Sequence, residues 1–188
     1  MENLFNDIAT DSFYVYSADI TANPKYEFMG TAMDSVQVSL LPYETRSSYN
    51  WDHDFGACYK FPLSTNTMAL IARVPAEYVS SAIKLFVFDI EKDSIVKTIN
   101  LANTFGDAGD VAVYSSYIFK DEEKRMLMLT YYWSSYDHSV YNENDTTIDY
   151  WHNYYLFNLT SNSIDTLSKD SATICTNYST ILRKLAHE

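Results

Sequence analysis

The chain has 188 residues, a length typical of one domain that buries its own hydrophobic core. Aromatic residues make up 16% of it, and Gly and Pro number only 4 each, so the composition excludes disordered, linker-rich and collagen-like chains. Lys and Arg number 13 against 25 Asp and Glu, which gives a net charge of -12 at pH 7. Nucleic acid and anionic membrane surfaces repel such a chain, so we expect no nucleic-acid partner and a glycan or protein partner instead.

The first seven residues have neither the basic nor the apolar part of a signal peptide, and no apolar run is long enough to cross a bilayer. We therefore expect no transmembrane segment. We expect a cytoplasmic protein if the chain is intact, and a periplasmic, lipid-anchored or secreted protein if a leader has been removed.

Predicted strands account for most of the chain. Three N-terminal stretches within residues 1–50 have strand-like composition, at residues 13–17, 26–33 and 36–41. Aromatic and β-branched residues then recur with turn signals between them, which is typical of an all-β domain. A first group of four predicted strands comprises residues 57–63, 67–74, 83–90 and 94–101. A second group comprises residues 114–120, 126–133, 150–159 and 163–167, and a short helix is predicted at residues 179–187.

The two groups of strands repeat one another. Residues 88–95 read Phe-Asp-Ile-Glu-Lys-Asp-Ser-Ile, and residues 157–164 read Phe-Asn-Leu-Thr-Ser-Asn-Ser-Ile, with the aromatic, apolar and turn positions in register. Each group has tight first and third turns, and in this it resembles a blade of a β-propeller. The resemblance implies two four-stranded meanders. Two blades do not close a ring, so we predict one all-β domain over residues 1–188, arranged as a β-sandwich or a partial-propeller-like sheet.

In such a meander the longer loops lie at the end opposite the tight turns. That end would gather residues 50–54, the loop around Tyr78, residues 104–110 and residues 134–149. Because loops on a rigid scaffold often carry binding residues, we predict ligand binding at this aromatic and acidic loop face. The candidate binding residues are Trp51, Asp52, His53, Asp107, Asp110, Trp133, Tyr136, Asp137, Trp151 and His152.

The candidate residues are also suited to purely structural roles. Trp and Tyr rings stack on sugars or on the apolar groups of a protein partner, but Trp133 and Trp151 are equally suited to pack together as a cross-strand pair. The histidines lack the spacing of a zinc site, so we predict no metal and no cofactor. Calcium is possible at Asp107 and Asp110, although the neighbouring glycines favour a tight backbone connection instead.

The two cysteines, Cys58 and Cys175, could form a disulfide in an oxidising compartment; the other reading is two buried free thiols, or one exposed thiol. One pair in a chain of this length is a weak indication of compartment. We expect free thiols, and keep the disulfide as the alternative.

The function that fits these features best is a non-catalytic binding or interaction module of the bacterial cell envelope or secreted fraction. An acidic inhibitor or immunity-type protein that blocks a basic enzyme is the alternative. An all-β glycoside hydrolase is a third hypothesis, because such enzymes need only a suitably spaced pair of carboxylates. The open edges of a sheet with two blades also make an oligomer possible.

Overall fold

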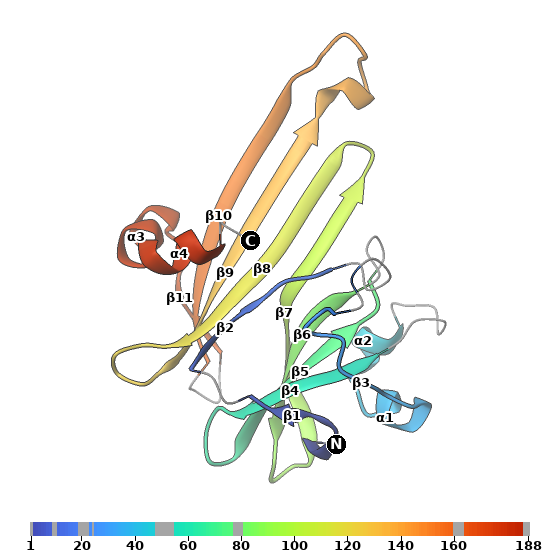
Figure 1. Cartoon of the computed structure of the whole chain (residues 1–188), viewed down its shortest axis with the longest axis vertical. Coiled ribbons are helices and arrows are strands. Elements are labelled where there is room, and N and C mark those ends of the chain that lie inside the picture. The colour runs from blue at the N-terminus through green and yellow to red at the C-terminus, as the bar shows by residue number, and fades with distance from the viewer. Residues whose placement is uncertain are drawn as a thin grey trace. The chain divides into compact units, whose positions relative to one another are not determined.

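The computed structural model describes residues 2–8, 11–18, 23, 25–47, 55–76, 81–159 and 164–185 (Figure 1). The chain divides into two compact units, the first comprising residues 1–10 and 17–103 and the second residues 11–16 and 104–188. Strands dominate both units, which confirms the all-β prediction. In the described part of the chain no helix is long and apolar enough to span a membrane. A single domain over residues 1–188 stays a prediction.

The first unit contains the first predicted meander. Its strands are β1 (Asn6–Asp7), β3 (Thr31–Ala32), β4 (Gly56–Pro62), β5 (Thr67–Val74), β6 (Ala82–Asp89) and the first part of β7 (Ser94–Asp107). Strands β4 to β7 pair antiparallel in chain order, whereas β1 pairs with β4 in parallel and β3 pairs with β4 antiparallel. The four-stranded meander predicted from the sequence is therefore present in this unit.

The core of the first unit surrounds β5, which is buried on both faces. Its sequence is a nearly continuous apolar run, as expected for a strand covered on both sides. The buried cluster on one face includes Val38 of a short helix, α1 (Ser35–Ser39), together with Leu70 of β5 and Phe86 of β6. Each such buried side chain stabilises the fold by about 1.5 to 3 kcal/mol.

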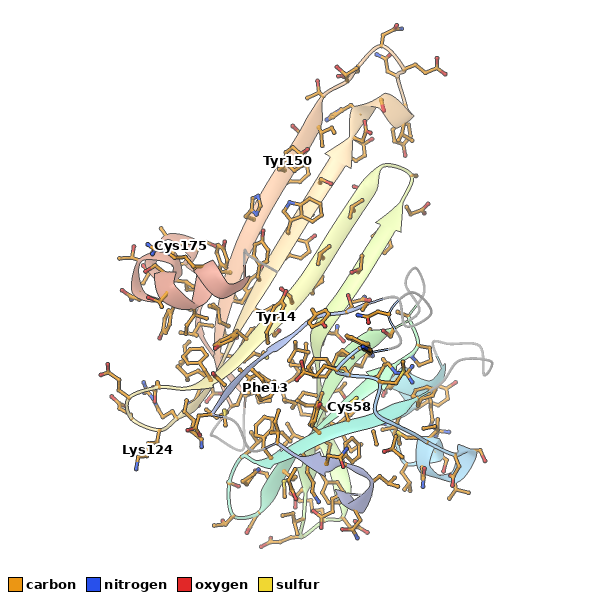
Figure 2. The ribbon with its side chains drawn as sticks, in the orientation of Figure 1. Phe13, Tyr14, Cys58, Lys124, Tyr150 and Cys175 are labelled. Atoms are coloured by element: carbon orange, nitrogen blue, oxygen red, sulfur yellow. The ribbon has the colours of Figure 1, made fainter. Side chains whose placement is uncertain are left out.

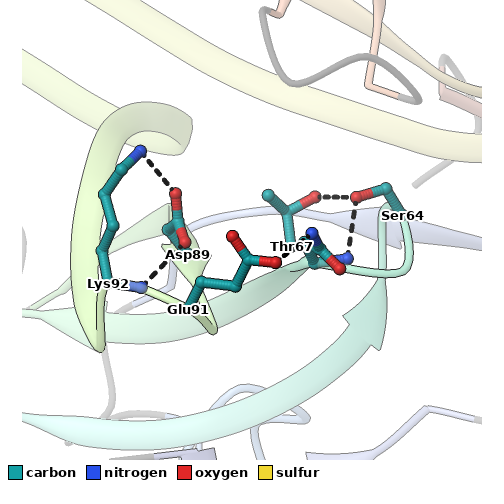
Figure 3. Close-up of polar contacts among 6 residues, drawn as sticks. Ser64, Thr67, Asp89, Glu91 and Lys92 are labelled. Atoms are coloured by element: carbon teal, nitrogen blue, oxygen red, sulfur yellow. Dashed lines mark hydrogen bonds and ion pairs between the residues drawn. The ribbon is translucent and has the colours of Figure 1, made fainter.

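The two tight turns of this meander lie side by side, as predicted for its first and third turns (Figure 3). The Asn66 side-chain amide donates a hydrogen bond of 2.7 Å to Glu91 Oε1, which links the β4–β5 turn to the β6–β7 turn. Each turn also has its own polar contact, at 2.7 Å between the Ser64 and Thr67 hydroxyls and at 2.7 Å between Lys92 Nζ and Asp89.

Two of the predictions for the N-terminal strands are wrong. Residues 36–41, predicted as a strand, contain helix α1, and residues 26–33 contribute only the short strand β3. A capping box starts α1: Gln37 N donates to the Asp34 carboxylate at 2.9 Å, and Asp34 N donates to the Gln37 side chain at 2.9 Å. These two bonds satisfy backbone donors that an extended segment would leave for a neighbouring strand. A second short helix, α2 (Tyr43–Ser47), and a 3-10 turn, η1 (Glu2–Leu4), were not predicted.

The second unit contains the second predicted meander. Its strands are β2 (Ser12–Val15), the end of β7, β8 (Asp110–Lys120), β9 (Met126–Asp137), β10 (Ile148–Asn158) and β11 (Asp165–Ser168). Strands β8 to β11 pair antiparallel in chain order, and β2 adds to β8 on the side away from β9. The prediction of a strand near residues 13–17 is confirmed by β2.

Two helices cover one end of this sheet. The predicted C-terminal helix is confirmed as α4 (Ser179–Leu185), and α3 (Ser171–Asn177), which was not predicted, precedes it. Asp170 caps α3 by accepting a hydrogen bond of 3.0 Å from Ala172 N. Ile174 of α3 and the buried side chains of the sheet beneath it form one cluster, which comprises Tyr117, Phe119, Leu127, Leu129, Leu156 and Ile174.

Strands β7 to β10 extend further than predicted. Residues 104–110, predicted as a loop, form the end of β7 and a tight turn into β8, in which Ala108 and Gly109 have φ of 47° and 91°. Positive φ at both central positions is the geometry of a two-residue hairpin turn. Residues 134–149, also predicted as a loop, continue β9 and β10, whose pairing reaches Asp137 and Ile148. The predicted loop face is therefore largely a sheet surface.

Candidate functional site

The candidate site lies on β8, β9 and β10 of the second unit, beyond the part that α3 and α4 cover. Residues that face each other across antiparallel strands share one face of the sheet. His152 lies opposite Trp133, and Trp133 lies opposite Val113, so these three share one face. Trp151 lies opposite Ser134 on the other face. We refer to these as the Trp133 face and the Trp151 face.

The Trp133 face carries a row of rings on β9 and β10. Tyr131 lies nearly parallel to Tyr154, with ring centroids 5.2 Å apart, and nearly parallel to His152, at 5.8 Å. Trp133 and Tyr150 are stacked in the same way at 6.4 Å. These five side chains, which we call the aromatic row, lie at every second position of the two strands.

The aromatic row begins in the core and ends in solvent. Tyr131 and Tyr154 pack against the buried cluster beneath the helices, whereas Tyr150 is 57% exposed (Figure 2). The Tyr131 hydroxyl and His152 Nδ1 form a hydrogen bond of 2.6 Å. Burial raises the pKa of Tyr131 and of Tyr154, so both hydroxyls stay protonated at neutral pH. The row is thus anchored at one end and open at the other.

The Trp151 face carries a second, sparser set of rings. Tyr114 on β8 and Tyr132 on β9 lie opposite each other with ring centroids 4.6 Å apart. Trp151 is 49% exposed and lies opposite Ser134, not opposite another ring. Tyr136 contacts Tyr141, with ring centroids 6.1 Å apart.

The two tryptophans therefore do not form a cross-strand pair, which was the structural role considered for them. Trp133 and Trp151 differ by one position from the register that would place them opposite each other. Side chains alternate between faces along a strand, so this single-residue difference puts them on opposite sides of the sheet. The predicted candidates divide accordingly. Trp133, Asp137 and His152 lie on one face, and Asp110, Tyr136 and Trp151 lie on the other.

The end of the β9–β10 hairpin is polar. His138 Nε2 and Asp149 Oδ2 are 2.9 Å apart, and this hydrogen bond raises the pKa of His138. Asp137 caps the 3-10 turn η2 (His138–Val140) by accepting a hydrogen bond of 2.9 Å from Ser139 N. Hydrogen bonding to the side chain and the backbone of Ser139 lowers the pKa of Asp137. Asp145 accepts a hydrogen bond of 3.0 Å from Thr147 N, and hydrogen bonding to the side chain and the backbone of Thr147 lowers the pKa of Asp145. These carboxylates are occupied in shaping the hairpin.

The hairpin end contains one imidazole–carboxylate pair, His138 with Asp149. Among the described residues, the side chain of His138 forms its hydrogen bond with Asp149. In nucleophilic catalysis, an imidazole that a carboxylate orients in this way must also contact a nucleophile. The residues that the structure describes contain no group of three His, Cys, Asp or Glu side chains placed to hold a metal ion. Asp107 and Asp110 flank the tight β7–β8 turn, which is the backbone connection favoured over calcium binding for this segment.

Three members of the predicted site, Trp51, Asp52 and His53, lie outside the described residues. Conversely, the sequence reasoning missed Tyr131, Tyr150 and Tyr154. The available signal was the alternation of Tyr150, His152 and Tyr154 at every second position, which is the spacing of one strand face.

Comparison of the chain with protein-family models, with curated proteins and with solved structures found no match.

Proposed function

We propose that this protein is a non-catalytic binding module, of the bacterial cell envelope or secreted fraction, that binds a glycan chain along the aromatic row. The observation that carries the proposal is the row itself: five rings on one sheet face, paired in near-parallel stacks at 5.2 to 6.4 Å and increasingly exposed toward Tyr150.

Such a row suits an extended ligand with apolar ring faces and many hydroxyls. Trp and Tyr supply rigid apolar area at low cost in side-chain entropy, and their polar tips hydrogen-bond to the ligand. Strands β9 and β10 fix the spacing of the rings, because they pair without interruption from Ile148 opposite Asp137 to Asn158 opposite Leu127. The protein thus orders little on binding, which favours affinity.

The test compares Trp133→Ala with Trp151→Ala by isothermal calorimetry and thermal melts against a panel of soluble neutral and acidic glycans. Both substitutions remove the same side chain from one hairpin, but on opposite faces. We expect Trp133→Ala to weaken binding of the glycan that binds wild type by roughly tenfold or more, about 1.4 kcal/mol, and Trp151→Ala to leave it within a factor of about two.

Equal affinity of wild type and Trp133→Ala would refute the proposal. Binding to a neutral glycan should also change little with salt, because no charge pairing drives it. A flat glycan panel, together with strongly salt-dependent binding to a basic enzyme, would instead support the acidic inhibitor. Circular dichroism of both variants checks that the sheet is retained.

A further inference from the structure

In the part of the chain that the structure describes, the outer edge of β10 is open over most of its length. Strand β10 pairs with β9 along all its residues, but it pairs with β11 only from Leu156 to Asn158. Among the residues that the structure describes, no strand pairs with the outer side of residues 148–153. A strand edge of this kind presents unpaired N–H and C=O groups that are suited to bind another strand.

Two hydrogen bonds show which backbone groups point outward. Tyr154 N donates to the Ser171 hydroxyl at 3.1 Å, on the side away from β9, whereas Thr147 O accepts from His138 N at 3.0 Å, on the side toward β9. Backbone direction alternates along a strand, so the outward groups are those of Ile148, Tyr150 and His152. Ser171 and α3 limit the open edge at one end, and the turn into η2 limits it at the other.

This edge has few of the features that usually prevent strands from pairing with one another: its one carboxylate, Asp149, bonds to His138. Residues 148–153 read Ile-Asp-Tyr-Trp-His-Asn and contain no Lys, Arg or Pro. Large apolar side chains flank the open backbone on both faces of the sheet, next to the polar Asp149, His152 and Asn153. Ile148, Tyr150 and Trp151 are 43%, 57% and 49% exposed. A second strand laid along this edge would cover them on both sides.

We propose that this edge pairs antiparallel with the same edge of a second copy of the chain, about a two-fold axis at Tyr150. Each Tyr150 then lies opposite Tyr150 of the other copy, and Ile148 lies opposite His152. The three outward residues of each copy exchange up to six backbone hydrogen bonds in this register. A two-fold dimer is closed, so the pairing stops at two copies.

Charge favours this register over its neighbours. Centred on Tyr150, the pairing places Asp149 opposite Trp151, so no carboxylate faces a carboxylate, and His138 already holds the Asp149 side chain at 2.9 Å. Centred one residue earlier, Asp149 would face itself, and like charges directly opposite each other destabilise a strand pair. Centred one residue later, Ile148 would have to pair with Tyr154, whose N–H already bonds to Ser171.

The test is sedimentation equilibrium of the full chain from micromolar to millimolar concentration, at low and high salt. We expect a monomer–dimer equilibrium that strengthens with salt, because two chains of net charge -12 repel each other less when screened. Tyr150→Lys and Tyr150→Glu should each be monomeric, since the axis makes each new charge face itself, and an equimolar mixture of the two should dimerise again. Tyr141→Lys, at a 75% exposed position outside the edge, is the control and should dimerise like wild type.

A wild-type chain that is monomeric at every concentration overturns the proposal. So does a dimer that Tyr150→Lys and Tyr150→Glu leave intact, because it would use another surface. Rescue by the mixture excludes misfolding of the two variants as the cause of dissociation. Hydrogen exchange gives a second reading: the amides of Tyr150 and His152 should become protected at high concentration, and the amide of Trp151 should be protected at every concentration.

Discussion

The turn between β7 and β8 gives the sharpest prediction for stability. Gly109 has a φ of 91°, and a Cβ added there would lie 2.8 Å from Val140 Cγ2 and 2.9 Å from the Asp137 carbonyl oxygen. The carbonyl is part of β9 and cannot move freely, because Asp137 N donates to Gly109 O at 3.0 Å. Left-handed backbone costs an L-residue about 1 to 2 kcal/mol, and the steric conflict adds about 1 to 3 kcal/mol. Gly109→Ala should therefore lower the free energy of unfolding of the second unit by about 2 to 5 kcal/mol.

Gly106→Ala is the matched control. It lies three residues earlier in the same hairpin, and its added Cβ would meet only ordinary contacts, at 3.8 Å from Asp110 O and 4.0 Å from Val111. Urea unfolding followed by tryptophan fluorescence in a Trp51→Phe background reports on the second unit, because Trp133 and Trp151 both lie in it. If Gly109→Ala loses less than about 0.5 kcal/mol, a change ordinary for surface substitutions, the reasoning about this turn is wrong.

Burial and hydrogen bonding support three more predictions. Leu129→Ala, at a fully buried position beneath the helices, should lower the free energy of unfolding by about 2 to 5 kcal/mol in the same urea experiment. The bond to Asp149 raises the pKa of His138, so it stabilises the hairpin below the unfolded-state pKa of histidine, and this stability is lost as the pH rises through the higher folded-state pKa. Proton NMR titration of His138 should show the raised pKa, and Asp149→Asn should lower it, because the Asp149 hydrogen bond is the largest cause of the shift. Cys175 is exposed and Cys58 is buried with a pKa raised to about 11, chiefly by desolvation, so a thiol reagent should modify one cysteine in the native protein and both after denaturation. A disulfide between them would give no reaction in either state.

The sequence predicted those elements whose signals are local. Strand β5 has the predicted bounds, because a continuous apolar run between two turns defines both ends of a buried strand. Helix α4 was predicted from the helical spacing of its apolar residues. Helix α1 was missed because Val36, Val38 and Leu40 alternate as in a strand. Its real signal was Asp34 with Gln37 three residues later, a capping pair that needs no apolar period.

The composition of the candidate site depended on the register between β9 and β10, which the sequence alone does not show. Aromatic residues near Trp133 and Trp151 were predicted to matter, but whether two rings share a face is set by the cross-strand register. A shift of one residue between β9 and β10 would exchange every partner, placing Trp151 opposite Trp133 in place of His152. The register follows from the length of the hairpin end and its hydrogen bonds, which only the folded structure supplies.

Strand β2 has a consequence for how the protein is made. Residues 11–16 belong to the second unit although the first unit's chain precedes and follows them, and Tyr14 pairs with Tyr117. During synthesis this strand leaves the ribosome about a hundred residues before its partner β8. Phe13 and Val15, which are buried in the folded protein, therefore lack their partner strand until β8 has been synthesised. A shortened chain that starts at residue 104 would lack them altogether. The second unit is thus completed by its earliest residues, and a nascent chain cannot finish it until β8 has emerged.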